Sequence, residues 1–242
     1  MELTGKVAVV TGGAHRVGKA IALALAGAGA HLVIHYHGSA EADATLAEIE
    51  ALGVRAIGVS ADLGDPAGAT EVFEAAEREF GGVDLLVNSA ASFQSGSVLT
   101  LSPEEWRDTL NINLSGPFYC AQLAARSMQA RGGGAIVNIA DLSGLQPWAK
   151  YPAHSVSKAG LLMLTKVLAK ALAPSIRVNA IAAGSVIKPP DWEEARWQAS
   201  SQHTLLKRPG SGYDVAHAAL FLLQEDYITG TTLLVDGGRS IA

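Results

Sequence analysis

Short apolar runs rich in β-branched residues alternate with longer alanine-rich stretches along the chain, and this alternation constrains the fold more than any other feature. The runs lack polar alternation, which is typical of parallel strands covered on both faces. We expect seven strands, at residues 6–11, 31–36, 54–60, 83–88, 134–140, 175–182 and 231–236.

The stretches between these runs carry apolar residues three and four positions apart, the spacing of amphipathic helices. We expect helices within residues 17–29, 40–53, 66–82, 103–133, 154–174 and 213–225. Repeated strand–helix units with right-handed crossovers predict one doubly wound parallel sheet with helices on both faces. We therefore interpret residues 1–242 as a single-domain α/β protein with a seven-stranded Rossmann fold.

One segment, residues 184–212, shows no clear periodicity. It follows the sixth expected strand, and in open α/β sheets ligands bind outside the carboxyl ends of the strands. We expect this segment to be a lid or substrate loop within the domain.

Charge and composition exclude several classes of protein. The formal net charge is −5, so nothing favours a nucleic-acid partner. No apolar run is long enough for a membrane span, and the first residues contain no signal-peptide segment. The one cysteine, Cys120, has no internal disulfide partner, which favours a reducing compartment. These features predict a cytoplasmic enzyme with a small-molecule substrate; no membrane partner and no metal site are predicted.

A glycine-rich turn, TGGAHRVG, follows the first expected strand and opens a helix. Such a turn lets the backbone approach a pyrophosphate at the N-terminus of the helix. The second strand ends at Tyr36 without the acid that binds the ribose 2′-hydroxyl of NAD. Arg16, His37 and Ser39 would instead surround a 2′-phosphate, with the arginine as the strongest partner. The sequence therefore predicts NADPH/NADP⁺ as the cofactor.

Several motifs together resemble those of the short-chain dehydrogenases/reductases over nearly the whole chain. The turn is similar to the family's TGxxxGxG, with Arg16 at the middle glycine, and Ala183 stands where the family has proline. The further matching segments are SADLGDP, VNSAASF, NINLSG, RVNAIAAGSV and ITGTTLLVDGG. The resemblance implies a cofactor site made of Gly12, Arg16, Val17, Gly18, Tyr36, His37, Ser39, Asp62, Leu63, Asn88, Ser89, Ala90, Lys158, Gly184 and Val186. It also implies a homotetramer built through the two longest helices.

The segment YPAHSVSKAG resembles the catalytic segment of this family with one residue changed. His154 occupies the position of the tyrosine that donates the proton, and Lys158 follows it by one helical turn, on the same face. Asp141 lies 13 residues before His154, where the wider family has serine. The resemblance also implies an active-site asparagine at Asn113. The expected catalytic residues are therefore Asn113, Asp141, His154 and Lys158.

The two charged neighbours act on the imidazole of His154 in opposite senses. The Lys158 ammonium favours the neutral ring, which is a weak proton donor. The Asp141 carboxylate favours the imidazolium, which is a competent acid near neutral pH. The net effect depends on the distances between the three groups.

Within the family, the chain resembles the pteridine reductases. Arg16 in the turn, the stretch HYHGSA and the stretch NSAASF are similar to segments of those enzymes, which also have an aspartate at the position of Asp141. The resemblance implies that Phe93 stacks on a pterin, and that Arg16, Phe93, Asp141 and Tyr151 contact the substrate.

Three functional interpretations remain open. In the first, Asp141 and His154 form the acid pair of an NADPH-dependent, pteridine reductase-like enzyme that transfers hydride to a C=N or C=O bond. In the second, the chain is a catalytically impaired NADP(H)-binding scaffold or regulator. In the third, it is a carbonyl reductase acting on a non-pterin substrate, such as a 3-ketoacyl, sugar or steroid ketone.

Overall fold

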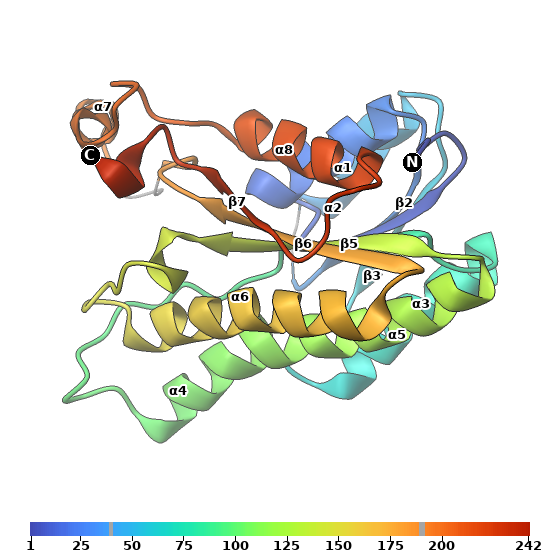
Figure 1. The fold of residues 1–242 in the computed structure, drawn as a ribbon, viewed down its shortest axis with the longest axis horizontal. Coiled ribbons are helices and arrows are strands. Elements are labelled where there is room, and N and C mark those ends of the chain that lie inside the picture. The colour runs from blue at the N-terminus through green and yellow to red at the C-terminus, as the bar shows by residue number, and fades with distance from the viewer. Residues whose placement is uncertain (39–40, 189–191) are drawn as a thin grey trace.

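The computed structural model describes residues 1–38, 41–188 and 192–242, and within them seven parallel strands form one sheet in the order β3-β2-β1-β4-β5-β6-β7. The predicted fold class is confirmed: the sheet is doubly wound, with helices on both faces (Figure 1). The strands are β1 Val7–Thr11, β2 His31–Tyr36, β3 Ala56–Ser60, β4 Leu85–Asn88, β5 Gly134–Asp141, β6 Ile176–Ala183 and β7 Thr232–Val235. Each expected strand is present, with its ends shifted by at most two residues.

Burial along the strands explains their uninterrupted apolar runs. Every residue of the central strands β1 and β4 is buried, because helices cover both faces there. The edge strands β3 and β7 are only partly buried. The predicted sequence pattern is therefore clearest at the centre of the sheet.

Two groups of helices cover the sheet (Figure 1). Helices α1 Arg16–Gly27, α2 Ala42–Glu50 and α8 Gly212–Gln224 pack on one face, where they share one apolar core. Helices α3 Pro66–Phe80, α5 Gly116–Ala130 and α6 Pro152–Leu172 pack on the other face around a second core. In the described ranges, no helix combines the length and the apolarity that crossing a membrane requires.

The long helix expected within residues 103–133 is present and contains a π-helical turn. It consists of α4 Pro103–Leu110, a π-helical turn η1 Asn111–Ser115, and α5. The sequence did not predict the π-helical turn, because apolar spacing continues across it and does not reveal a change from i+4 to i+5 hydrogen bonding. The turn is significant for the site because it carries Asn113.

The segment 184–212 contains regular structure that the sequence did not predict. A short helix, α7 Glu194–Ser200, is followed by a 3₁₀ turn, η3 Ser201–His203. Two helical turns are too few for apolar periodicity to stand out. Further 3₁₀ turns lie at η2 Leu142–Gly144 and η4 Arg239–Ile241.

Candidate active site

A cavity of about 1390 Å³ opens where the carboxyl ends of the strands meet. Its wall contains most of the residues predicted from the sequence, although these come from segments far apart in the chain. The predicted residues that line it are Gly12, Arg16, Val17, Gly18, Tyr36, His37, Asp62, Leu63, Ser89, Ala90, Phe93, Asp141, Tyr151, His154, Lys158, Gly184 and Val186.

Two of the described predicted residues, Asn88 and Asn113, are not in that wall. Ser39 lies outside the described residues. Asn88 is buried, and its Nδ2 donates to Asn138 Oδ1 at 2.9 Å, which joins β4 to β5. Asn113 is also fully buried, and it reaches the site only through hydrogen bonds to residues of the wall.

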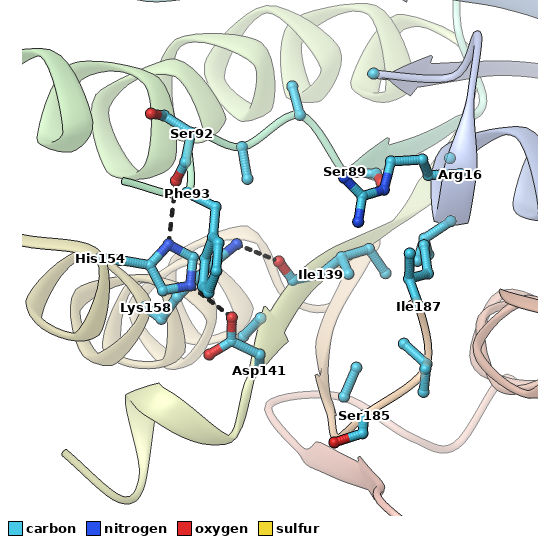
Figure 2. Close-up of a pocket in the computed structure, with 18 of the residues that line it drawn as sticks. Arg16, Ser89, Ser92, Phe93, Ile139, Asp141, His154, Lys158, Ser185 and Ile187 are labelled. Carbon is cyan, nitrogen blue, oxygen red and sulfur yellow. Dashed lines mark hydrogen bonds and ion pairs between the residues drawn. The ribbon is translucent and has the colours of Figure 1, made fainter. Parts of the chain in front are cut away.

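The glycine-rich turn has a geometry that requires its small residues. Gly12 has φ +62°, and a Cβ on Gly18 would lie 2.0 Å from the Gly12 carbonyl oxygen. Arg16 itself has a positive φ of 55° and projects its side chain towards the cavity (Figure 2). The N-cap residue of α1, His15, makes no side-chain cap, so first-turn N–H groups of that helix remain available to an anion.

A buried histidine, His35, supports this turn, although no sequence motif predicted it. His35 Nδ1 accepts the Gly12 N–H at 3.1 Å, and its Nε2 donates to Ala61 O at 3.0 Å. This pairing fixes a neutral ring, and burial lowers the pKa of His35 below its ordinary value. The residue was missed because its position in the run HLVIHY predicted only a strand.

His154 and Asp141 form a hydrogen-bonded pair, with 2.6 Å between His154 Nε2 and Asp141 Oδ2 (Figure 2). The other ring nitrogen, Nδ1, lies 3.1 Å from the carbonyl oxygen of Ser92. Both nitrogens therefore face oxygen acceptors, an arrangement that is fully satisfied only when the ring carries two protons. The Asp141 side chain is 20 % exposed and that of His154 only 3 %, so the carboxylate is the part of the pair nearer to solvent.

The carboxylate of Asp141 is held in its charged form. Burial raises the pKa of Asp141, but the hydrogen bond from His154 and the charge of Lys158 outweigh burial and lower it below its ordinary value. Ser143 contributes as well, since its backbone N–H donates to Asp141 Oδ1 at 2.9 Å and its hydroxyl donates to the same oxygen.

Asn113 fixes the position of the Ser92 carbonyl. Ser92 N donates to Asn113 Oδ1 at 2.7 Å, and Asn113 Nδ2 donates back to Ser92 O at 2.9 Å. The same Nδ2 lies 3.1 Å from Ser157 Oγ and 3.3 Å from His154 Nδ1. The two shorter contacts use both amide protons, which leaves the His154 Nδ1 proton to the Ser92 carbonyl.

Lys158 lies on α6 one turn after His154, and both side chains reach the cavity wall as predicted. Its Nζ donates to Ile139 O at 2.8 Å (Figure 2). Burial lowers the pKa of Lys158, and the charge of Asp141 partly opposes that effect. The three charged or polar groups of Asp141, His154 and Lys158 therefore act as one electrostatic unit.

Aromatic side chains cover the pair. Phe93 stacks on Tyr151, with ring centroids 4.4 Å apart, and stands edge-on to His154 at 4.7 Å. Phe93 is nevertheless 54 % exposed, so one part of its ring remains open. Figure 2 shows Arg16 on the opposite side of the cavity from Phe93 and His154. The cavity therefore has one end at Arg16 and another at the acid pair.

Comparisons with known proteins agree on one family. Residues 12–240 match a family model described as enoyl-(acyl carrier protein) reductase. A 3-oxoacyl-[acyl-carrier-protein] reductase of Synechocystis is 35 % identical, with 98 % of this chain and 97 % of the relative covered. A 3beta-hydroxysteroid dehydrogenase of Eggerthella lenta is 36 % identical, with coverages of 99 % and 95 %.

Solved structures are similar to this chain over its whole length. A short-chain type dehydrogenase/reductase from Mycobacterium marinum superposes with a TM-score of 0.92 at 30 % identity, and covers 100 % of this chain and 98 % of its own. An NADPH-dependent 3-quinuclidinone reductase from Rhodotorula rubra has a TM-score of 0.92 at 28 % identity, with coverages of 100 % and 93 %.

Proposed function

The chain belongs to the short-chain dehydrogenase/reductase family, and on that premise we propose that it is an NADP(H)-dependent reductase of carbonyl compounds. The observation that carries this proposal is the Asp141–His154 pair, which lies 2.6 Å apart in the wall of the cavity, beside the buried Lys158. The relatives support a carbonyl substrate, since their names specify 3-oxoacyl, hydroxysteroid and quinuclidinone compounds.

The residues at the other end of the cavity fit a dinucleotide. The turn from Gly12 to Gly18 leaves no room for side chains where its backbone closes, and the uncapped start of α1 offers N–H groups to a pyrophosphate. Asp62 and Leu63, after β3, line the same end and would contact the adenosine. When bound, the cofactor would supply a hydride to the carbonyl carbon.

NADP(H), not NAD(H), is the proposed cofactor. Arg16 and His37 line the cavity beside the end of β2, where Tyr36 replaces an acid. Arg16 makes no ion pair within the described ranges, so its guanidinium is available to a 2′-phosphate.

Asp141 and His154 would supply the proton that accompanies the hydride. The proton that lies between His154 Nε2 and Asp141 Oδ2 would pass to the carbonyl oxygen, leaving a neutral ring beside a carboxylate. Asn113 acts by orienting the Ser92 carbonyl, which holds the second ring proton. The nearby Lys158 ammonium would stabilise negative charge as it develops on the substrate oxygen.

A pterin substrate is the second candidate, and Phe93 favours it. The ring is 54 % exposed in the cavity wall and lies next to the acid pair, where a flat heterocycle would stack. Tyr151 already stacks on this ring, however, and the named relatives act on other compounds. A carbonyl substrate is therefore the first choice.

We also propose that the chain forms a homotetramer. Phe118 on α5 and Val156, Met163 and Val167 on α6 are large apolar side chains with 41–59 % exposure. Apolar side chains gathered on adjacent helices indicate a protein interface. Light scattering coupled to gel filtration tests this, and a monomeric mass at micromolar concentration would contradict it.

A substrate screen tests the proposed reaction. NADPH consumption would be followed with 3-oxoacyl thioesters, steroid ketones, small cyclic ketones and dihydrobiopterin, using the parent, His154→Ala and, as a control, His217→Ala, which alters an exposed residue of α8. We expect turnover of at least one ketone, with a loss of ~100-fold or more in His154→Ala alone.

Two other outcomes would redirect the proposal. Turnover of dihydrobiopterin alone would select the pterin interpretation. Tight NADPH binding by parent and variant, without turnover of any compound, would select the scaffold interpretation.

A further inference from the structure

Arg239 lies in the cavity wall. It begins the 3₁₀ turn η4, immediately after the β7 strand and its Gly237–Gly238 turn. The side chain is half-buried, and its Nη1 donates to the hydroxyl of Ser185, which follows β6. No sequence motif indicated a role for this arginine, because only the folded sheet brings it to the cavity.

Its donors are largely unused, unlike those of Arg131 and Arg177. Arg131 donates to both carboxylate oxygens of Asp84 and to Gly81 O. Arg177 donates to the carbonyls of Leu222, Leu223 and Ile228. In the described part of the chain, Arg239 donates from its side chain to Ser185 alone and has no carboxylate within ion-pair distance. A guanidinium has five N–H donors, so most remain available to a ligand in the cavity.

The strand order separates Arg239 from the 2′-phosphate end of the cavity. Arg16 follows β1, whereas Arg239 follows β7, four strand positions away in the sheet. At about 4.8 Å per strand this is roughly 19 Å. Asp141 ends β5, only two positions from β7, or roughly 10 Å. Gln146 Nε2 also donates to Ser240 O at 3.1 Å, which ties the loop after β5 to the turn that carries Arg239. Arg239 therefore lies on the substrate side of the acid pair.

The cavity wall holds a further cationic side chain and further aromatic rings. Arg196 and His203 line it as well, and Arg196 stacks over the ring of Trp192 at 4.1 Å. Among the described residues of the wall, only Asp62 and Asp141 are acidic; the first follows β3, and the second is already paired with His154. In a chain of net charge −5, this local excess of positive charge indicates an anionic ligand.

We propose that Arg239 binds a carboxylate of the substrate, so that the carbonyl compound is an oxo acid with its two functional groups several bonds apart. Guanidinium groups bind carboxylates through paired, charge-assisted hydrogen bonds. A roughly 10 Å span from the acid pair, less the reach of the arginine side chain, leaves room for a short chain between the carbonyl and the carboxylate. The inference rests on the proposed reductase function. The pyrophosphate of the cofactor is an anion of related chemistry, and the test separates the two.

The experiment compares each of two oxo acids, 4-oxopentanoate and 5-oxohexanoate, with its methyl ester. The parent is expected to prefer at least one acid over its ester by 10-fold or more in kcat/KM. Arg239→Met is expected to reduce that acid-to-ester ratio by roughly 10- to 150-fold, the range for loss of a charge-assisted hydrogen bond. Arg239→Lys is expected to retain part of the preference, and Arg78→Met, an exposed change on α3 outside the cavity, all of it. Melting temperatures establish that the variants fold.

Three results would overturn the inference. The first is a parent with no preference for either acid, and the second is an unchanged acid-to-ester ratio of kcat/KM in Arg239→Met. The third is weaker NADPH binding by Arg239→Met, which would assign Arg239 to the pyrophosphate of the cofactor. If neither these compounds nor any compound of the substrate screen is reduced, the reductase proposal fails, and the carboxylate site is then tested by binding. With NADP⁺ present, pentanoate is expected to raise the melting temperature of the parent, but not of Arg239→Met, and methyl pentanoate is not expected to raise either. No stabilisation of the parent by pentanoate would then overturn the site as well.

Discussion

Replacing Asp141 with asparagine tests the proposed proton donor most directly. The change keeps the shape of the side chain but removes a negative charge whose oxygen lies 2.6 Å from His154 Nε2. In the parent, Asp141 and the Ser92 carbonyl together accept both ring protons of His154. Without the carboxylate, the doubly protonated ring loses its balancing charge, and the neutral amide oxygen of asparagine is a weaker acceptor for the Nε2 proton. We therefore expect the reductase activity of Asp141→Asn to disappear at a lower pH than that of the parent.

The size of the shift follows from the buried hydrogen bond. A charge-assisted hydrogen bond contributes about 1.5–3 kcal/mol, and 1.36 kcal/mol corresponds to one pH unit. The pH at which activity is half-maximal is therefore expected to fall by about one to two units. The charge of Lys158 acts in the same direction, because the parent carboxylate also offsets this buried ammonium.

The assay is the rate of NADPH oxidation between pH 5 and 10 at a saturating concentration of a reducible ketone. His154→Tyr is the matched variant: it restores a phenol, which loses its proton near pH 10, so its activity is expected to extend to higher pH than that of the parent. NADPH affinity, measured by fluorescence, separates effects on binding from effects on proton transfer. Overlapping pH profiles for the parent, Asp141→Asn and His154→Tyr would refute the assignment of the acid pair.

Three further predictions concern the cofactor end. Arg16→Ala is expected to weaken NADPH binding by about 1.5–3 kcal/mol while leaving NADH binding nearly unchanged, as measured by titration; equal losses for both cofactors would contradict a 2′-phosphate site. Burial lowers the pKa of His35, so below the ordinary histidine value of 6.5 the unfolded chain takes up a proton that the folded chain does not, and stability falls as the pH falls. The melting temperature is therefore expected to depend less on pH between 7.5 and 5 in His35→Gln than in the parent, whereas the exposed control His217→Gln is expected to match the parent. Gly18→Ala would place a Cβ 2.0 Å from a carbonyl oxygen of the glycine-rich turn and is expected to cost about 1–3 kcal/mol of folding stability. Gly27→Ala, with open space around its Cβ, is the control and is expected to be neutral or stabilising. A stable Gly18→Ala protein with normal NADPH affinity would disprove the close-approach argument.

Much of the fold was predictable because its signals are local. A strand buried on both faces requires an apolar run, and a phosphate-binding turn requires glycine, so both leave a mark in a few consecutive residues. The approximate position of the site followed from these elements, since parallel strands end at the same edge of the sheet. The π-helical turn at Asn111–Ser115 and the short helix α7 were not predicted, because neither changes apolar spacing over a long enough stretch.

The contacts that define the site chemically were not predictable in the same way. The sequence placed Asp141 and His154 in one active site, but only the fold gives the distance between them and the Ser92 carbonyl on the opposite ring nitrogen. His35 lies in an apolar run that predicts only a strand, and its contact with Gly12 is visible only in the fold. Arg239 follows the C-terminal strand motif, and its contact with Ser185 is likewise visible only in the fold. Such contacts depend on which strands become neighbours, and residue spacing along the chain does not encode this directly.

The order of strands in the sheet also bears on how the molecule is assembled during synthesis. Strand β1 emerges first and later occupies the interior of the sheet, where β2 is added on one side. Its other edge has no partner until β4 arrives, since Ala8 pairs with Leu85. From that point β5, β6 and β7 are each added to the growing edge in the order in which a ribosome releases them. A nascent chain therefore acquires β2 and β4, the two strands beside β1 and its glycine-rich turn, before Asp141 and His154. Helix α8, which packs against α1, follows later, and Arg239, which comes after β7, is among the last residues to join the cavity.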